Sequence, residues 1–596
     1  MIANEYVLCA LLLYVISYAY YLVISHGLGN KATYLQLRRY IPCALLAVLP
    51  ATLTHLPLTH PLFVIPSIIW LLWIFTYPTL YYISNHKVSS DFEFHFEAVF
   101  GLYMIAWFSG IGLLAKHFSF LGIPAAIFIT LGEFLLLAIP AAQLVYYALY
   151  RACINENGMQ MLQETHYNEI IEFIKSMPWY INLGCFGSTL ASFAAIAYAN
   201  YTTLFIPVTM DLLSLGIILA LVIFLSIYIW KKKHGVFIRT AIVEFYLDMQ
   251  EYREKNKHYL DNLTERYATL EVKPLATPFA KPSTILLVIG ESESRDYMQA
   301  FAPAYKYPTT PWLSSQKEKD NFILFPHAYS IIGNTVLAVS NALTEMNQYN
   351  DKEFASSCSI IDIAHKLDYK VHWYSNQGHL GCADTPITIM ADTADVAKWT
   401  KQELNEVQYD ESLLQYLDEV DPAKNNFLVV HLKGSHFNFL NRYPEAFTKF
   451  GTPGKYDLEP NYANTVAYTD YVLEQIFNYC REKLNLQAMV YFSDHGTLPD
   501  RRRSPNFEGI GSLRIPLFTY FSDEYISKNP AIVSTLRQHK EHYWTNDLAY
   551  ELLCSVLNVE SNRFDESNSL ASPKFKFKRE DLLVDNGRMK IPASNQ

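Results

Sequence analysis

Two apolar runs in the C-terminal half of the chain are each followed by residues that could bind a metal. The run TILLVIG leads into Glu291, and the run MVYFS leads into Asp494 and His495. Carboxylate oxygens and an imidazole nitrogen are suitable ligands for Zn²⁺ or Mn²⁺. An acidic residue after a strand often caps the next helix, so Glu291 alone is weak evidence. The three residues together predict a metal site.

The elements around these residues alternate between strand and helix patterns. Short β-rich runs at Thr284–Ile289, Phe427–His431 and Ala488–Phe492 each end in polar residues, and helical patterns cover Ser359–Leu367 and Ala463–Tyr479. This alternation predicts a mostly parallel sheet covered by helices. Functional residues of such sheets lie at the carboxyl ends of the strands, where the candidate ligands fall.

The N-terminal half has a different character. A chain of 596 residues is too long to fold around one compact core, so two or more domains are expected. Hydrophobic residues make up 51% of the chain, and they are concentrated in residues 1–230. Seven segments approach the ~20 apolar residues that cross a bilayer, so we expect five to seven retained spans. The segments at 40–56 and 98–116 are the weakest. The seven segments are 5–25, 40–56, 61–84, 98–116, 120–150, 180–200 and 206–230.

This pattern predicts that the chain is divided into three parts. Residues 1–230 form a helical membrane domain, 231–280 a bridging helix and proline-bearing linker, and 281–596 the catalytic domain. Within the first part, 156–178 is amphipathic and predicts a helix at the membrane surface.

Charge and cysteine content narrow the partners and the compartment. The net charge of −10 argues against a nucleic-acid partner. Lys and Arg collect at 31–39, 151–175 and 231–233, which by the positive-inside rule would place these loops and the C-terminal domain in the cytoplasm. Cys358 and Cys382 could form a disulfide outside the cytoplasm or remain free thiols.

Three motifs carry a family resemblance. VIGESESRDYM, HLKGSHFNFLNRYP and YFSDHG resemble, in order and spacing, motifs of the bacterial phosphoethanolamine transferases. These are membrane-bound members of the alkaline phosphatase/sulfatase superfamily that modify lipid A or the lipopolysaccharide core. The resemblance covers about residues 280–525, and WYSNQ at 373–377 is closer to the core-modifying branch. It implies a multi-pass α-helical membrane domain followed by an α/β/α sulfatase-like domain.

The resemblance also implies a nucleophile and a mechanism. Thr335, in IIGNTVLAVSNAL, stands where the family has its catalytic threonine. One Zn²⁺, with Mn²⁺ as an alternative, would be held by Glu291, Thr335, Asp494 and His495. Thr335 would then take phosphoethanolamine from phosphatidylethanolamine and pass it to lipopolysaccharide or lipid A. The plainer interpretation of Thr335 is a helix N-cap.

Further residues are implied in substrate binding. His436 matches a family histidine that contacts the substrate or protonates the leaving group. Thr165 and Glu169 match a pair beneath the active site that contacts the ethanolamine headgroup, where a carboxylate would balance the ammonium charge. Weaker candidates for phosphate or headgroup contacts are Lys433, His379 and Gln377.

The chain departs from the family pattern at three places. Met161 replaces an expected Asn, Thr497 replaces a Glu, and the stretch LPDRRRSPNFEGIGSLRIP lacks a histidine found in several relatives. A second metal therefore has no support in the sequence. Arg501–Arg503 could bind an anionic acceptor but are more typical of a solvated loop.

Placing Thr165 and Glu169 in one compartment with Thr335 reverses the orientation given by the charge rule. The catalytic domain is then periplasmic and the protein a multi-pass protein of the bacterial inner membrane, expected to be a monomer. The acceptor stays open among a lipid A phosphate, a core heptose and a glucan. Two alternatives remain: a phosphoglycerol transferase of the same fold, and a non-catalytic membrane protein with a degenerate sulfatase-like domain.

Overall fold

The computed structural model divides the chain into two compact units, which are described separately. Unit 1 comprises Met1–Met159 and Met177–Gln250, and unit 2 comprises Gln160–Ser176 and Glu251–Gln596. The structure describes the chain apart from gaps, the longest of which are 28–36, 86–94, 160–169, 378–384, 401–406 and 501–508; shorter gaps fall within 151–158, 172–176, 205–207, 232–257, at 276 and 456, and at 1 and 594–596.

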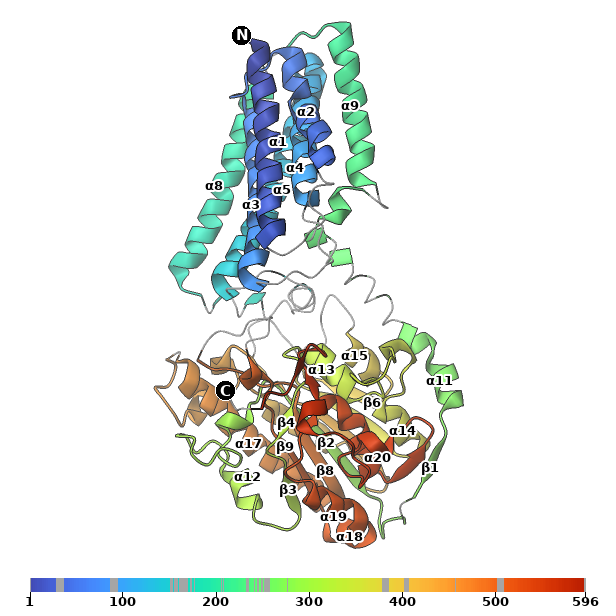
Figure 1. The fold of residues 1–596 in the computed structure, drawn as a ribbon. Helices are drawn as coiled ribbons and strands as arrows, with labels where there is room; N and C mark the ends of the chain where they lie inside the picture. The colour runs from blue at the N-terminus through green and yellow to red at the C-terminus, as the bar shows by residue number, and fades with distance from the viewer. Residues whose placement is uncertain are drawn as a thin grey trace. The chain divides into compact units, whose positions relative to one another are not determined.

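Unit 1 is a bundle of long apolar helices (Figure 1). Each of the seven apolar segments of the sequence forms a helix. Among the described residues, four helices are long and apolar enough to cross a membrane, and three more apolar stretches are shorter. The helices are α1 Ile2–Gly27, α2 Leu37–Thr54, α3 Pro61–Asn85, α4 His95–His117, α5 Gly122–Tyr150, α8 Trp179–Leu204 and α9 Leu212–Trp230.

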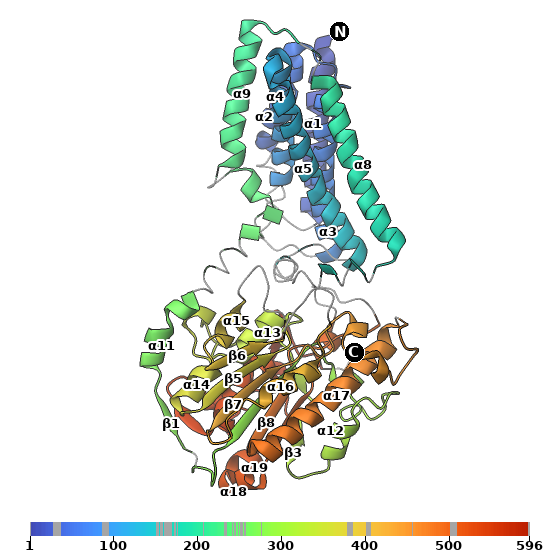
Figure 2. The ribbon, with the colours of Figure 1, turned by 180° about the vertical axis from the view of Figure 1, so that it is seen from behind.

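Helix α4 is the centre of this bundle. Of the 18 residues in its apolar stretch, 94% are buried within the protein, whereas only 6% are buried in the corresponding stretch of α8. Glycines let its neighbours approach closely: a Cβ on Gly101 would lie 2.5 Å from Trp70, and one on Gly112 would lie 2.5 Å from Leu62. Helices α8 and α9 lie on opposite sides of the bundle (Figures 1 and 2).

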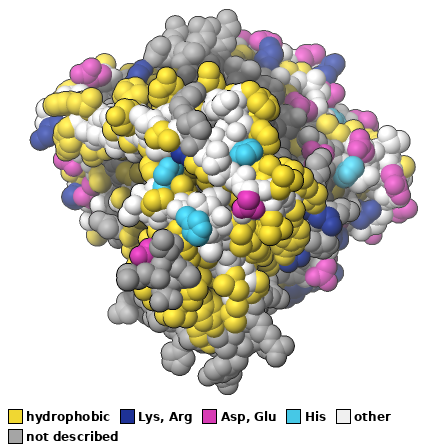
Figure 3. All heavy atoms as spheres, turned by 90° about the horizontal axis from the view of Figure 1, so that it is seen from above, with side chains coloured by type: hydrophobic (Ala, Val, Ile, Leu, Met, Phe, Trp, Pro, Cys, Tyr) yellow, Lys and Arg dark blue, Asp and Glu magenta, His cyan; other side chains and the backbone are white. Residues whose placement is uncertain are grey.

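The outer helices of unit 1 present apolar side chains to their surroundings. Phe186 and Leu190 on α8, Leu135 on α5 and Ile227 on α9 are all more than half exposed. In the view from above, hydrophobic side chains gather over the end of the bundle, with histidines and an acidic side chain between them (Figure 3). Such a surface fits a lipid environment and would be unfavourable in water.

Unit 2 is built on a seven-stranded sheet of order β3-β9-β8-β2-β7-β5-β6 among the described residues. Neighbouring strands from β8 to β6 are parallel, and β9 is antiparallel to both β8 and β3. All seven residues of β2 are buried, as expected of a central strand. The strands are β2 Thr284–Gly290, β3 Phe322–Leu324, β5 Lys370–Ser375, β6 Val396–Trp399, β7 Asn426–His431, β8 Leu486–Ser493 and β9 Leu517–Phe521.

Helices cover both faces of this sheet (Figure 2). Residues of odd number in β2, such as Leu287, pack in one core with α13, α14 and α20, whereas Leu286 and Val288 pack in a second core with α12 and α17. The helices are α11 Leu263–Thr269, α12 Pro311–Gln316, α13 Thr335–Ala342, α14 Ile360–Lys366, α15 Pro386–Ala391, α16 Leu414–Leu417, α17 Leu458–Lys483, α18 Asp523–Lys528, α19 Pro530–Gln538 and α20 Ala549–Val556.

Short strand pairs complete unit 2. They are β1 Val272–Pro274 with β11 Val559–Ser561, β4 Ala328–Tyr329 with β10 Trp544–Thr545, and β12 Leu583–Val584 with β13 Met589–Lys590. The three expected strands and two expected helices are all present within a few residues of their predicted bounds. The helical membrane domain and the α/β/α domain predicted from the sequence are thus confirmed, while the expected boundaries at 230 and 280 stay predictions.

Candidate active site

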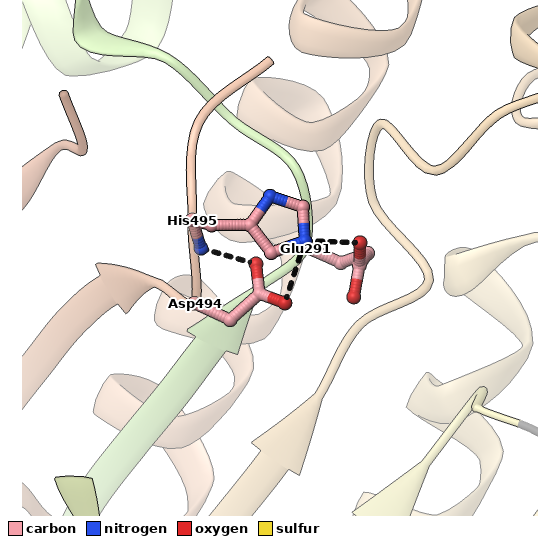
Figure 4. Close-up of side chains that lie close together, drawn as sticks. All are labelled: Glu291, Asp494 and His495. Atoms are coloured by element: carbon pink, nitrogen blue, oxygen red, sulfur yellow. Dashed lines mark hydrogen bonds and ion pairs between the residues drawn. The ribbon is translucent and has the colours of Figure 1, made fainter. Parts of the chain in front are cut away.

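The three predicted metal ligands meet at the carboxyl end of the central strands (Figure 4). Glu291 follows β2, and Asp494 and His495 follow the parallel neighbour β8. Their ligand atoms all lie within 4.8 Å of one another, and all three side chains are fully buried. Nε2 of His495 is 3.5 Å from Oε1 of Glu291 and 3.4 Å from Oδ2 of Asp494. Parallel pairing of the two strands brings these residues together, although about 200 positions separate them in the chain.

A hydrogen bond sets the direction of the His495 ring. Its Nδ1 lies 2.8 Å from the carbonyl oxygen of Gly496. Because a carbonyl can only accept, Nδ1 carries the proton and Nε2 of the neutral ring directs a lone pair toward the two carboxylates. Three electron-rich atoms facing one another require a proton or a cation between them.

The two carboxylates repel each other in this buried place. Burial, and after it the charge of Glu291, raises the pKa of Asp494 well above its usual range. Oδ1 of Asp494 accepts from the backbone N–H of Ser292 at 2.9 Å, whereas Oδ2 is buried without a hydrogen-bond donor among the described residues. A divalent cation would satisfy that oxygen and both charges, so the donor set fits Zn²⁺.

Thr335 lies beside this cluster at the start of α13. Its Oγ1 donates to Oε2 of Glu291 at 2.9 Å. The N-cap position belongs to Asn334, whose side chain accepts from the backbone N–H of Leu337 at 3.0 Å. The N-cap interpretation of Thr335 is therefore wrong, and its hydroxyl is available for chemistry. The positive end of the helix dipole would favour a phosphate at this place.

Gln377 also contacts the cluster. Its side-chain amide donates to Oε2 of Glu291 at 3.3 Å and to the carbonyl of Leu432 at 2.7 Å. On the other side, Ser292 donates its hydroxyl to Oε1 of Glu291 at 2.5 Å. Glu291 is thus held by neighbours through both carboxylate oxygens, which fixes the direction of a metal ligand.

The loop after β7 brings two further predicted residues toward the site. The backbone N–H of Ser435 donates to the carbonyl of Glu291 at 2.9 Å, which places His436 one residue beyond this contact. Nδ1 of His436 lies 2.5 Å from the carbonyl of Phe437, so this nitrogen carries a proton. Lys433, in the same loop, is largely buried.

His431, at the end of β7, is buried, and neither of its ring nitrogens has a hydrogen-bond partner among the described residues. Burial lowers its pKa to about 4, against the opposing effect of Glu291. The sequence left open whether this residue is part of the core. The structure places it in the sheet beneath the site as a neutral side chain.

Other predictions cannot be placed. Thr165, Glu169 and His379 lie outside the described residues, as do Arg501–Arg503, most of the expected surface helix 156–178, and Cys382. Cys358 is buried and free.

One residue that sequence reasoning missed is Asp410, in a 3₁₀ turn over Asp410–Leu413. Its buried carboxylate accepts hydrogen bonds from the backbone N–H groups of Lys433 and Gly434. An acidic residue at the start of a short turn has no local signature that could reveal contacts 23 and 24 residues away.

The fold and the site define a multi-pass membrane protein that carries a soluble sulfatase-type domain. A family model described as Sulfatase matches residues 283–554. Phosphoethanolamine transferase EptC of Escherichia coli K12 is 25% identical over 480 residues, which are 73% of this chain and 80% of the relative. Phosphoethanolamine transferase EptA of the same strain is 24% identical over 326 residues, 50% of this chain and 57% of the relative.

A solved structure extends the likeness to the membrane unit. This structure is the integral membrane protein lipooligosaccharide phosphoethanolamine transferase A of Neisseria meningitidis. The match covers 88% of this chain and 98% of the solved chain, with a TM-score of 0.54 and 17% identity. That likeness shows a shared fold. The chain is therefore similar in sequence to the phosphoethanolamine transferases, and the resemblance recognised in its sequence is confirmed.

Proposed function

We propose that the protein transfers phosphoethanolamine from phosphatidylethanolamine to lipopolysaccharide, on lipid A or the inner core, through a covalent phospho-threonine at Thr335. The observation that carries this proposal is the bond between Thr335 and Glu291 inside a cluster that also holds Asp494 and His495. A hydroxyl, a carboxylate that accepts its proton and a metal-binding set form the parts of a nucleophilic phosphoryl-transfer site. The names of the relatives support the transferred group.

The donor set suits one Zn²⁺, with Mn²⁺ as the alternative, bound by Glu291, Thr335, Asp494 and His495. Such an ion, when bound, would lower the pKa of the threonine hydroxyl and stabilise negative charge on the transferring phosphoryl group. The buried Oδ2 of Asp494 and the Nε2 of His495, which faces both carboxylates, support this set.

In the first half-reaction, Oγ1 of Thr335 attacks the phosphorus of the donor. The hydroxyl proton passes to Oε2 of Glu291, which already accepts it as a hydrogen bond. A new Thr335 O–P bond forms as the P–O bond to diacylglycerol breaks. His436, protonated on both nitrogens, gives the Nε2 proton to the departing oxygen while Nδ1 remains on the carbonyl of Phe437.

In the second half-reaction the acceptor takes the group from Thr335. A hydroxyl of the acceptor attacks the phosphorus and gives its proton to the now neutral His436. The Thr335 O–P bond breaks, and Glu291 returns its proton to the threonine oxygen. The site is then in its starting state.

The same proposal assigns the protein to the bacterial inner membrane, as a monomer with the catalytic unit in the periplasm. The apolar exterior of unit 1 supports a membrane location. Thr165 and Glu169 would contact the ethanolamine headgroup, and Lys433, His379 and Gln377 the phosphate or headgroup. The direct bonds from Gln377 to Glu291 and Leu432 favour a supporting role for that residue.

Mass spectrometry of lipopolysaccharide tests this function. Cells that carry the gene should show lipopolysaccharide heavier by one phosphoethanolamine group, and fragmentation should locate the group on lipid A or the inner core. Cells without the gene, or with Thr335→Ala, should lack it. An increment that persists in the Thr335→Ala strain would contradict the mechanism, and its absence in wild-type cells would contradict the acceptor.

A further inference from the structure

We infer that Asp410 is a positioning residue of the active site: it fixes the loop Leu432–His436 against the main chain of Glu291. This inference rests on the proposed function, because it concerns the loop that carries His436. Asp410 lies in the 3₁₀ turn Asp410–Leu413, and its side chain is 3% exposed.

Asp410 holds two successive peptide groups of the loop. Oδ1 accepts from the backbone N–H of Lys433 at 2.7 Å, and Oδ2 accepts from the backbone N–H of Gly434 at 2.8 Å. Two bonds to neighbouring peptides determine both the position and the orientation of the loop at that point. A charged acceptor makes these bonds stronger than those between neutral groups.

The opposite side of the loop packs on Glu291. The backbone N–H of Ser435 donates to the carbonyl of Glu291 at 2.9 Å. Gly434 has a φ of +49°, and a Cβ added to it would lie 2.7 Å from the carbonyl oxygen and 3.0 Å from the nitrogen of Glu291. Only glycine allows this approach, so the loop lies between Asp410 on one side and a metal-ligand residue on the other.

Asp410 is itself held in place. The side-chain amide of Asn376 donates to Oδ1 at 2.8 Å, the hydroxyl of Thr400 donates to the amide oxygen of Asn376 at 2.6 Å, and the backbone N–H of Asn376 donates to the carbonyl of His431 at 3.0 Å. All three described donors to Asp410 are N–H groups, so its carboxylate acts only as an acceptor. This arrangement suits positioning and leaves the chemistry to other residues.

Loss of the bonds to Asp410 would also affect His436, because His436 belongs to the same loop. His436 follows Ser435 directly, so a loop released from Asp410 would move the imidazole relative to Thr335. A displacement of about 1 Å in a catalytic group can cost about 100-fold in rate. Replacing Asp410 by asparagine would direct an NH₂ group at one of the two backbone N–H donors and break at least one bond.

Asp470 supplies a matched control. It is also 2% exposed and accepts from two successive backbone N–H groups, those of Trp312 at 2.8 Å and Leu313 at 3.1 Å. Those bonds anchor the start of α12, on the face of the sheet away from α13. Asp410→Asn and Asp470→Asn therefore remove the same kind of contact at different places.

The test measures diacylglycerol release from phosphatidylethanolamine in detergent micelles by the full-length, metal-loaded protein, with thermal unfolding in parallel. Asp410→Asn should lower kcat about 10- to 100-fold with a smaller change in KM, whereas Asp470→Asn should keep kcat within about 2-fold at a comparable loss of thermal stability. In a His436→Ala background, Asp410→Asn should add little further loss, because both changes act on the same imidazole.

Equal kcat for Asp410→Asn and wild type, or the same fold-loss with and without His436, would overturn the inference. Asn376→Ala removes one donor from Asp410 and should give a smaller loss of kcat, which His436→Ala should also suppress. This variant serves as the test if Asp410→Asn does not fold. A loss of kcat that is independent of His436 would again overturn the inference. Wild-type protein that releases no diacylglycerol would instead refute the proposed function, so the two failures are distinguishable.

Discussion

The hydroxyl of Thr335 donates to the carboxylate of Glu291 across 2.9 Å, although 44 positions separate the two residues. Glu291 directly follows the fully buried strand β2, and Thr335 is the first residue of α13, which packs against one face of the sheet. The candidate nucleophile and the acceptor of its proton are therefore placed by the two most regular kinds of element in the fold.

Removing the Thr335 hydroxyl should abolish turnover. Thr335→Ala should lower diacylglycerol release by at least ~10³-fold, as loss of a covalent nucleophile does, while Thr335→Ser should retain measurable activity because it keeps an oxygen in place. Release rates measured at saturating phosphatidylethanolamine would show this. Near-normal turnover by the alanine variant would assign the nucleophile elsewhere.

Metal content should depend on the buried carboxylates. Asp494→Asn and Glu291→Gln should purify with less than one equivalent of zinc, because each removes an anionic ligand. Elemental analysis of the purified protein gives the count. Asp470→Asn is the matched control, since Asp470 is almost equally buried but bonds the backbone N–H groups of Trp312 and Leu313 on the other face of the sheet. Wild-type protein without bound metal would contradict the proposed site.

Chelation should also destabilise the wild-type protein. A metal that binds only the folded state adds to its stability, so its removal lowers the unfolding temperature. Asp494→Asn should show little response to the same chelator. An identical response in both proteins would indicate that the chelator acts at another place.

The N-cap of α13 should matter for turnover as well as for stability. Asn334→Ala should cost about 1 kcal/mol, as cap removal usually does, and should also lower kcat because Thr335 is the next residue. Ser359 caps α14 through a capping box with Asp362 and lies outside the site. Ser359→Ala should therefore cost similar stability with unchanged kcat. Equal kcat for both variants would show that the cap does not position Thr335.

Stability should depend on pH through Glu551. Burial raises the pKa of this side chain from 4.5 to about 8. The folded state then holds a proton that the unfolded chain releases, so this contribution is complete below pH 4.5 and is lost as the pH rises to about 8. Glu551→Gln should be more stable than wild type at pH 8, by about 1–3 kcal/mol, with little difference near pH 4.5. Unfolding measured at both pH values checks this. The same difference in stability between Glu551→Gln and wild type at pH 4.5 and pH 8 would contradict the raised pKa of Glu551.

The metal ligands were predictable because their signal is topological. Parallel strands end at one edge of a sheet, so residues directly after β2 and β8 had to lie near one another. The same reasoning could not find Asp410, which acts through backbone groups of a loop more than 20 residues away. Long-range contacts of an irregular segment have no periodicity to read.

Helix α4 shows a second limit of sequence reasoning. The segment 98–116 was among the weakest of the expected spans, yet α4 is the most buried helix of the four that could cross a membrane. Its glycines, including Gly101 and Gly112, allow neighbouring helices to approach closely. Hydropathy measures affinity for lipid, whereas a central helix is selected for close packing against protein.

The central claim is that Thr335 carries the phosphoryl group between donor and acceptor. Intact-protein mass spectrometry after incubation of the full-length protein with phosphatidylethanolamine, without acceptor, tests it directly. The proposed function predicts a mass increment of one phosphoethanolamine group, located on Thr335 by peptide fragmentation, lost on addition of lipopolysaccharide and absent from Thr335→Ala. An unmodified Thr335 in protein that still releases diacylglycerol, or an adduct on another residue, would contradict it.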